Sequence, residues 1–338
     1  MCSTSCPPGY RKAQKELQPK CCFDCIACAD GEMANTTDME NCIKCTDYQW
    51  SNEDRTKCIF KPIEFLSFGD PLGIALTCIA ILLSVVSLGV LLLYISNRET
   101  AIVKANNRTI SYIILFSLIQ SFLCSLLFIG RPLATTCLIR QVAFGITFTI
   151  CISSVLAKTI IVVIAFNATK PGSKSRQWVG SNIHTYIVSI CTMGEAIICF
   201  ACFFQSPPFP ETGMKETDKI ILQCNEGMAF YFVVGYMGLL ALLSFIVAFF
   251  ARNLPSTFNE AMHITFSMFI FCSVWLSFIP AYMSTKGKYM VAVEVFAILA
   301  SSAGLLCMFI PKCYIIIIRP DLNNKVNLIG RNVTVTIH

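Results

Sequence analysis

Residues 72–95 read LGIALTCIAILLSVVSLGVLLLYI and contain no charged side chain. A helix needs about 20 apolar residues to cross a hydrocarbon core of about 30 Å, so this segment is long enough to span a membrane. Backbone groups in lipid must bond to one another, and the sequence lacks the alternating strands of a membrane barrel, so helices are predicted. Six further apolar runs of sufficient length follow, at residues 110–130, 138–166, 183–204, 227–251, 261–283 and 290–310.

The composition indicates a chain that lies mostly in lipid. Of its 338 residues, 55% are hydrophobic and 14% are charged, against about 45–50% and 25% in an ordinary soluble domain. The net charge of +6 is spread over short loops. It forms no patch or stripe of the kind that would indicate nucleic-acid binding.

A cysteine-rich module precedes the first apolar segment, since nine of the 20 cysteines fall within the first 58 residues. This density is typical of small extracellular modules whose loops are joined by disulfides. Export needs a signal, and no signal peptide follows Met1. Either the first membrane helix acts as the signal or the chain is a fragment, and we expect a fragment. The nine cysteines of the module are Cys2, Cys6, Cys21, Cys22, Cys25, Cys28, Cys42, Cys45 and Cys58.

Two arguments predict an extracellular N-terminus in the plasma membrane. The disulfides place the cysteine module outside the cell. The loops that then lie inside carry eleven basic residues against five outside, in agreement with the positive-inside rule. The inner residues are Arg98, Lys104, Arg108, Lys170, Lys174, Arg176, Arg252, Lys312, Arg319, Lys325 and Arg331, and the outer ones are Arg131, Lys215, Lys219, Lys286 and Lys288.

The predicted fold class is membrane all-α, a seven-transmembrane helix bundle preceded by a small, disulfide-rich, short-stranded domain. The expected divisions are an extracellular nine-cysteine domain at 1–59, a linker at 60–71, the membrane domain at 72–318 and a short cytoplasmic tail at 319–338.

The sequence gives no sign of catalysis. It has no nucleotide-binding loop, no nucleophile–base motif and no metal-ligand spacing, and its three histidines (His184, His263 and His338) stand far apart. We therefore predict neither an enzyme nor a bound cofactor or metal.

The inner loops and tail are too short for a signalling domain, so action inside the cell requires a partner. One glycosylation sequon lies on the outer side, at Asn35.

Three motifs make the chain resemble class C (family 3) G-protein-coupled receptors over nearly its whole length. The spacing of the nine cysteines and the number of spans also match that family. The motifs are TAIVKANNR at residues 100–108, NLPSTFNEA at 253–261 and PKCY at 311–314.

Within this class, other stretches are most similar to vomeronasal type-2 (pheromone) receptors. Extracellular calcium-sensing and amino-acid taste receptors are the nearest alternatives. The stretches are CSLLFIGRP at residues 124–132, STKGK at 284–288 and ILASSAGLL at 298–306.

The resemblance implies a disulfide pairing that the spacing by itself does not establish. Cys21 is left over, to bond to the bilobed ligand-binding domain that precedes the module in such receptors and is missing from this chain. The implied bridges within the module are Cys2–Cys22, Cys6–Cys25, Cys28–Cys42 and Cys45–Cys58.

Two further cysteines lie at the edges of apolar runs. Cys137 opens the third span, and Cys224 closes the long second outer loop. Resembling receptors join them by a disulfide across the mouth of the bundle, and two unpaired thiols are the alternative. The remaining cysteines are expected to be small buried hydrophobic residues.

Ionisable side chains inside lipid are costly and usually functional. Lys158 lies near the inner end of the third span, and Glu260 begins the sixth. Resembling receptors pair these positions as an inner lock that holds the resting state. The alternative is that Lys158 extends its ammonium group to the membrane surface. The inner-loop residues expected to face a G protein are Lys104, Arg108, Phe258 and Asn259.

A group of residues near the outer side could line an allosteric pocket, as matching residues do in calcium-sensing relatives. Ordinary core packing of the aromatic rings is the alternative, with Glu294 paired to Arg140. The candidate residues are Arg140, Gln141, Phe144, Trp275, Phe278, Tyr282 and Glu294.

Glu195, in the fourth span, departs from the family pattern. An acid at this depth either faces a neighbouring helix or stays protonated, and the sequence names no partner for it.

Signal transduction is the predicted function. A missing outer domain would bind a pheromone, peptide or amino-acid-like ligand, and the bundle, as a homo- or heterodimer, would engage a heterotrimeric G protein. A truncated fragment that acts by dimerising without signalling is one alternative, and a calcium-sensing, amino-acid-sensing or taste receptor is another. A transporter or channel would require inverted repeats or broken helices, which the sequence does not show.

Overall fold

The computed structural model describes residues 3–14, 22–168, 182–205, 207–213, 218–225, 227–252 and 260–319. The chain forms two compact units. The first comprises Met1–Phe65 and Glu211–Gln223, and the second comprises Leu66–Pro210 and Cys224–His338.

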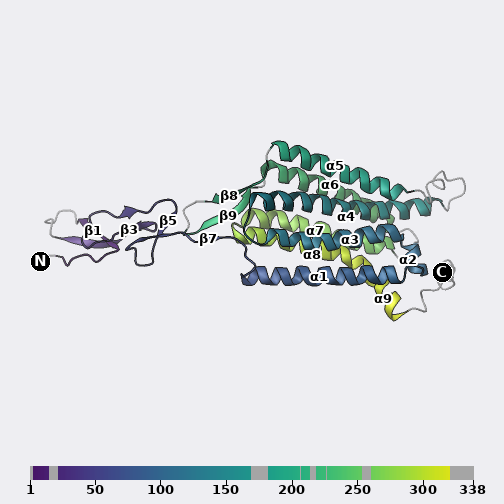
Figure 1. Ribbon diagram of the computed structural model, residues 1–338, viewed down its shortest axis with the longest axis horizontal. Helices are drawn as coiled ribbons and strands as arrows, with labels where there is room; N and C mark the ends of the chain where they lie inside the picture. Colours follow the sequence, from purple (N-terminus) through teal and green to yellow (C-terminus); the bar gives the residue numbers. More distant parts are fainter. Residues whose placement is uncertain are drawn as a thin grey trace. The chain divides into compact units, whose positions relative to one another are not determined.

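The first unit is built from short strand pairs (Figure 1), and disulfides cross-link it. Its buried core consists mainly of half-cystines, with Cys6 and Cys28 almost fully inaccessible. A module of this size cannot build a large apolar core, so covalent bridges replace it. The antiparallel pairs are β1 (Tyr10–Gln14) with β2 (Phe23–Ala27), β3 (Glu32–Met33) with β4 (Ile43–Lys44), and β5 (Gln49–Ser51) with β6 (Cys58–Phe60).

The segment expected to be a plain linker contains a strand, β7 (Ile63–Glu64). It pairs in parallel with β9 (Ile220–Asn225), whose other neighbour is β8 (Phe209–Gly213). The partner strand lies more than 150 residues away along the chain, so no local sequence pattern could reveal this pairing.

The second unit contains seven helices long and apolar enough to cross a membrane, counted over the described residues. This confirms the predicted fold class. The third span begins at Ala134, earlier than predicted, and the last is interrupted by a 3₁₀ turn before Pro311. The helices are α1 (Pro71–Ser96), α2 (Ala101–Ala105), α3 (Arg108–Cys124, extended by η1, Ser125–Phe128), α4 (Ala134–Ala168), α5 (Ile183–Gln205), α6 (Gly227–Ala251), α7 (Glu260–Ser284), α8 (Lys288–Leu306, extended by η3, Cys307–Phe309) and α9 (Ile310–Ile318).

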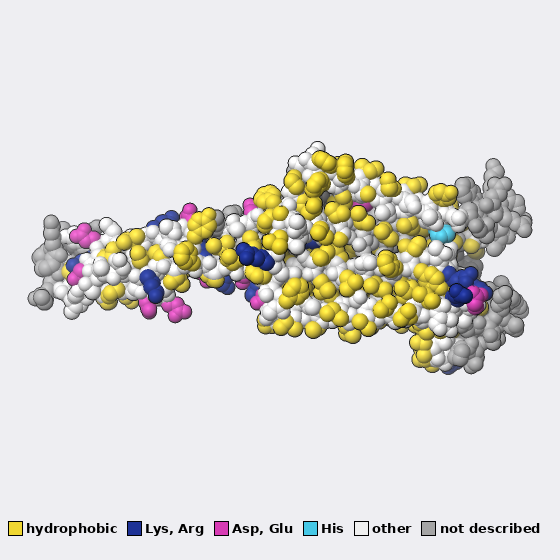
Figure 2. Space-filling view, in the orientation of Figure 1, with side chains coloured by type: hydrophobic (Ala, Val, Ile, Leu, Met, Phe, Trp, Pro, Cys, Tyr) yellow, Lys and Arg dark blue, Asp and Glu magenta, His cyan; other side chains and the backbone are white. Residues whose placement is uncertain are grey.

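The spans differ in how deeply they are buried. In the most apolar window of each span, 61% of the residues are buried in α4 and 67% in α8–α9, but only 11% in α5. Helices α4 and α8 therefore form the centre of the bundle. Hydrophobic side chains cover the outward faces of the helices (Figure 2), as expected for a surface solvated by lipid.

Small residues allow the central helices to approach closely. A Cβ atom added at Gly304 of α8 would lie 2.6 Å from Cγ2 of Ile270 in α7. The hydroxyl groups of Ser121 in α3 and Ser302 in α8 lie 2.7 Å apart and share a hydrogen bond. These contacts fix α3, α7 and α8 against one another.

Candidate functional site

A buried cluster of charged and polar side chains lies at the inner end of the bundle. The carboxylate oxygen Oε1 of Glu260, at the start of α7, forms ion pairs with the ammonium groups of two lysines at once. The Nζ atom of Lys158 in α4 is 3.0 Å away, and that of Lys312 in α9 is 2.6 Å away. The side chains of both lysines are at most 5% exposed, and that of Glu260 is 13% exposed.

Asn106, between α2 and α3, completes the arrangement. Its side-chain oxygen Oδ1 accepts hydrogen bonds from both lysines, and its backbone carbonyl accepts one from Lys158 at 2.9 Å. Its amide Nδ2 donates to the hydroxyl of Tyr94 in α1 at 3.2 Å. We call Asn106, Lys158, Glu260 and Lys312 the inner cluster.

The inner cluster joins four parts of the bundle through groups that have little access to water. A hydrogen bond that involves an ionised group is stronger than a neutral one, and the low dielectric of the interior strengthens it further. Removal of one partner leaves a buried charge uncompensated, which costs several kcal/mol. The cluster therefore couples the position of α7 to those of α4 and α9.

The structure brings together the two residues predicted for the inner lock, Lys158 and Glu260. The prediction did not include Lys312 or Asn106. The sequence did contain an indication of Lys312, because it is the single charged residue in the apolar run 310–318. Asn106 gave no such signal, since a polar residue in a short loop is ordinary.

A second charged group surrounds Glu99 in the first inner loop and is exposed. The carboxylate of Glu99 lies 2.6 Å from Nζ of Lys104, 3.3 Å from Arg108 and 3.7 Å from Arg98. The hydrogen bond from Lys104, with the charges of the three basic groups, holds the pKa of Glu99 below its ordinary value. Lys104 and Arg108 thus lie at the inner surface, whereas the predicted Phe258 and Asn259 fall outside the described residues.

The aromatic residues predicted to line an outer pocket contact one another. The ring centroids of Trp275 lie 5.8 Å from Phe144 and 5.2 Å from Phe278, which in turn lies 5.2 Å from Tyr282. The guanidinium of Arg140 lies 4.8 Å from the ring of Phe128. Arg140 and Glu294 are both buried. The rings therefore pack against one another, which agrees with the alternative of ordinary core packing.

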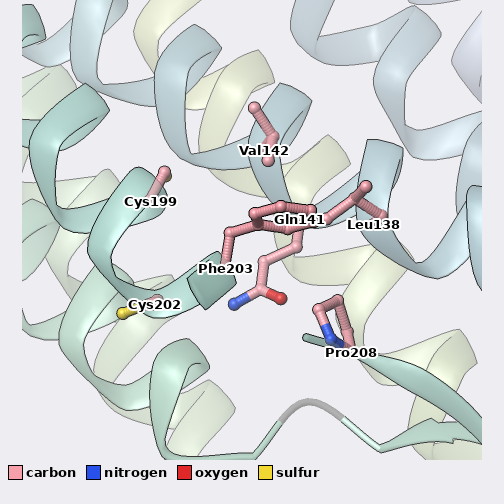
Figure 3. A pocket seen from close by; sticks show the side chains of 7 residues that line it. All are labelled: Leu138, Gln141, Val142, Cys199, Cys202, Phe203 and Pro208. Carbon is pink, nitrogen blue, oxygen red and sulfur yellow. The ribbon is translucent and has the colours of Figure 1, made fainter. Parts of the chain in front are cut away.

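Gln141, another of the candidate residues, lines a small cavity. It extends from α4 into a small cavity of about 10 Å³ against α5, near Phe203 and Pro208 (Figure 3). This volume corresponds to about one water molecule. The other lining residues are Leu138, Val142, Cys199 and Cys202.

Glu195 of α5 is fully buried and faces α4. Its Oε1 atom lies 3.7 Å from Sγ of Cys199, and a Cβ atom added at Gly145 would lie 2.8 Å from the same oxygen. The glycine leaves room for the carboxyl group between the two helices.

The structure contains four disulfides among the described cysteines. Cys22 is also disulfide-bonded, but its implied partner Cys2 and the leftover Cys21 fall outside the described residues. The bridges join Cys6 to Cys25, Cys28 to Cys42, Cys45 to Cys58, and Cys137 to Cys224.

Two surface features of the first unit bear on the remaining predictions. Asn35, the predicted glycosylation position, is exposed. Asp38 follows it with a positive φ of 64° and accepts hydrogen bonds from the Ser5 hydroxyl at 2.7 Å and the Cys6 backbone at 2.9 Å. These bonds hold the pKa of Asp38 below its ordinary value.

The part of the chain that the structure describes contains no group of three or more His, Cys, Asp or Glu residues able to hold a metal ion. Its charged cluster instead holds three helices together. Such an arrangement suits a conformational switch.

Comparison with known proteins agrees with this architecture. Residues 66–312 match the family described as "7 transmembrane sweet-taste receptor of 3 GCPR", and residues 1–51 match the "Nine Cysteines Domain of family 3 GPCR". The first match covers most of the chain.

Individual relatives are similar over nearly the whole chain. Vomeronasal type-2 receptor 26 of Mus musculus is 53% identical over 94% of this chain and 38% of its own length. The extracellular calcium-sensing receptor of Homo sapiens is 49% identical over 95% of this chain and 30% of its own length. G-protein coupled receptor family C group 6 member A of Carassius auratus is 38% identical over 96% of this chain and 37% of its own length.

This chain thus spans well under half the length of the relatives it matches. The seven apolar helices of the described residues, together with the receptor family match, identify a multi-pass protein of the plasma membrane. The motifs, the disulfide module and both family matches lead to one conclusion. The chain belongs to the class C, or family 3, G-protein-coupled receptors.

Proposed function

We propose that this chain relays a signal from an extracellular ligand to a heterotrimeric G protein, and that it has no catalytic activity of its own. The observation that carries the proposal is the ionic contact of Glu260 with Lys158 and Lys312. It joins α7 to α4 and α9 at the inner end of a family 3 bundle. Movement of α7 would break these contacts and open a cleft toward the cytoplasm.

The inner cluster acts in this proposal as the restraint on the resting state. Its ionic contacts exist only while α7 lies against α4 and α9. A state in which α7 has moved loses them, so the cluster lowers the population of that state. A signal from outside must supply the free energy to break them.

The ligand would be a pheromone, peptide or amino-acid-like molecule, bound outside the membrane bundle. The similarity to vomeronasal type-2 receptors supports this assignment. Assembly as a homo- or heterodimer is part of the same proposal. Family membership does not favour a transporter or a non-signalling fragment.

The test is the ligand-independent activity of Lys158→Ala and Glu260→Ala. Each removes one partner of the lock, so we expect basal nucleotide exchange on the G protein to rise roughly tenfold, which corresponds to about 1.4 kcal/mol. Exchange is measured in membranes at matched surface expression and at saturating G-protein concentration, so that release of the resting state is measured and not the affinity for the partner.

Lys288→Ala is the matched control. Lys288 lies at the start of α8, where its ammonium group is 4.0 Å from Asp70, so its loss removes a lysine without touching the lock. Basal exchange should then equal that of the unmodified chain. Unchanged basal exchange in both lock variants would contradict the proposal.

A further inference from the structure

The inner cluster contains more positive than negative charge. Two lysine side chains contact a single carboxylate oxygen, and their other shared partner, Oδ1 of Asn106, is neutral. Glu260 is thus the only acidic side chain that contacts the pair among the described residues. The stretches 169–181 and 253–259 contain no acidic residue at all, and 320–338 contains only Asp321.

The excess charge becomes larger when α7 moves. Glu260 is the first residue of α7 and leaves with it, whereas Lys158 belongs to α4 and Lys312 to α9. Two ammonium groups then face each other across Asn106 without a carboxylate. Unpaired charges in a site of low dielectric cost several kcal/mol, so the open state favours an incoming anion.

The geometry of the resting state indicates which anion fits. One carboxylate oxygen already lies 3.0 Å from Lys158 and 2.6 Å from Lys312. Both lysines are buried inside the bundle, away from the lipid-facing surface. Access to them after α7 moves is from the cytoplasm, where the protein partner binds.

We propose that Lys158 and Lys312 together form a binding site for a carboxylate of the G protein, which takes the place of Glu260 when α7 moves away. This inference rests on the proposed function. Glu260 then has two roles, since it closes the resting bundle and occupies the site that the partner must fill. The exchange of one carboxylate for another would make G-protein binding and α7 displacement mutually dependent.

The experiment uses the full chain in nanodiscs of neutral phosphatidylcholine, with the Glu260→Gln substitution as background. This substitution removes the lock acid and keeps both lysines, so activation needs no ligand. The concentration of G protein that gives half-maximal nucleotide exchange is then measured. The variants compared with Glu260→Gln alone add Lys158→Gln, Lys312→Gln, Lys312→Met or the control Arg252→Gln.

Each lysine substitution should raise the half-maximal G-protein concentration by about tenfold or more, because it removes a buried charge partner. Arg252→Gln should change it by less than about twofold, because Arg252 is exposed and stacks on Phe249 at the inner end of α6. Lys312→Met keeps an unbranched, apolar side chain only one atom shorter and fits a buried site, so it replaces Lys312→Gln if that variant does not fold.

A double-mutant cycle identifies the group on the partner. Acidic residues of the G-protein α subunit are changed one at a time to Asn or Gln. One of these changes should weaken binding to Glu260→Gln but not weaken it further once Lys312 is also replaced.

The remaining outcomes separate the two proposals. If Glu260→Gln stimulates exchange but the lysine variants bind equally well, the carboxylate site is wrong and the proposed function stands. If the lysine effect requires discs with phosphatidylserine, a lipid headgroup is the ligand and the inference is overturned. If no variant stimulates exchange above empty discs, both proposals fail.

Discussion

At the scale of single residues, the neutral side chain of Asn106 is the most informative. It lies between two ammonium groups, at a position where a carboxylate would balance the charge. An amide accepts hydrogen bonds from both lysines but supplies no charge of its own. The cluster is therefore held less tightly than it could be, which is what a switch requires.

Substitutions at Asn106 should change stability in opposite directions. Asn106→Asp adds a carboxylate of the same shape, so we expect a higher temperature of thermal unfolding and lower basal exchange. Asn106→Leu removes the acceptor and should destabilise the bundle by about 1–3 kcal/mol. Reaction of the buried thiols of Cys124 and Cys151 with a fluorescent dye reports unfolding. The prediction is wrong if the two variants shift the temperature in the same direction.

At the scale of elements, the contact between α7 and α8 controls how α7 can move. Gly304 allows the backbone of α8 to approach Ile270 so closely that a Cβ atom would overlap with it. Pro280 also lies inside α7, where it removes one backbone hydrogen bond and permits a bend. These features make α7 a helix that packs tightly at one point and can bend at another.

Gly304→Ala should destabilise the resting bundle by about 1–3 kcal/mol, since it forces the β-branched Ile270 to move. Basal exchange should rise at the same time, because α7 is pushed from its resting position. Gly89→Ala in α1 is the control, as nothing lies within 4 Å of its added Cβ atom. Equal unfolding temperatures for the two variants would refute the assignment of a tight contact.

At the scale of the whole molecule, disulfides provide stability that packed apolar side chains provide in other proteins. They form most of the buried core of the first unit. In the second unit, the bridge from Cys137 to Cys224 joins residues 87 positions apart, at the start of α4 and in β9. The bridge restricts the conformations available to the loop that leads into α6.

Loss of this bridge should lower the stability of the bundle. We expect Cys137→Ser, Cys224→Ser and the double variant to lose the same amount, about 2–4 kcal/mol, because each removes the same loop constraint. Faster hydrogen exchange in Ile220–Asn225 should accompany the loss. Cys78→Ser, at an exposed free thiol of α1, provides the control. Additive losses in the double variant would show that the two thiols act separately.

The sequence by itself determined the membrane class, the number of spans and the presence of a disulfide module. These follow from uninterrupted apolar length and from cysteine density, which are local properties of the chain. The pairing of Lys158 with Glu260 was foreseen only through resemblance to a family, since neither residue specifies a partner 102 positions away.

Only the tertiary structure decided the composition of the inner cluster. Lys312 and Asn106 are 206 residues apart, yet both contact the same group of charges. The same holds for Gln141, which lines a small cavity together with Cys199 and Phe203 of α5. The rotation of each helix about its axis determines which polar side chains meet. Helices that are apolar on nearly all sides carry little periodicity from which that rotation could be predicted.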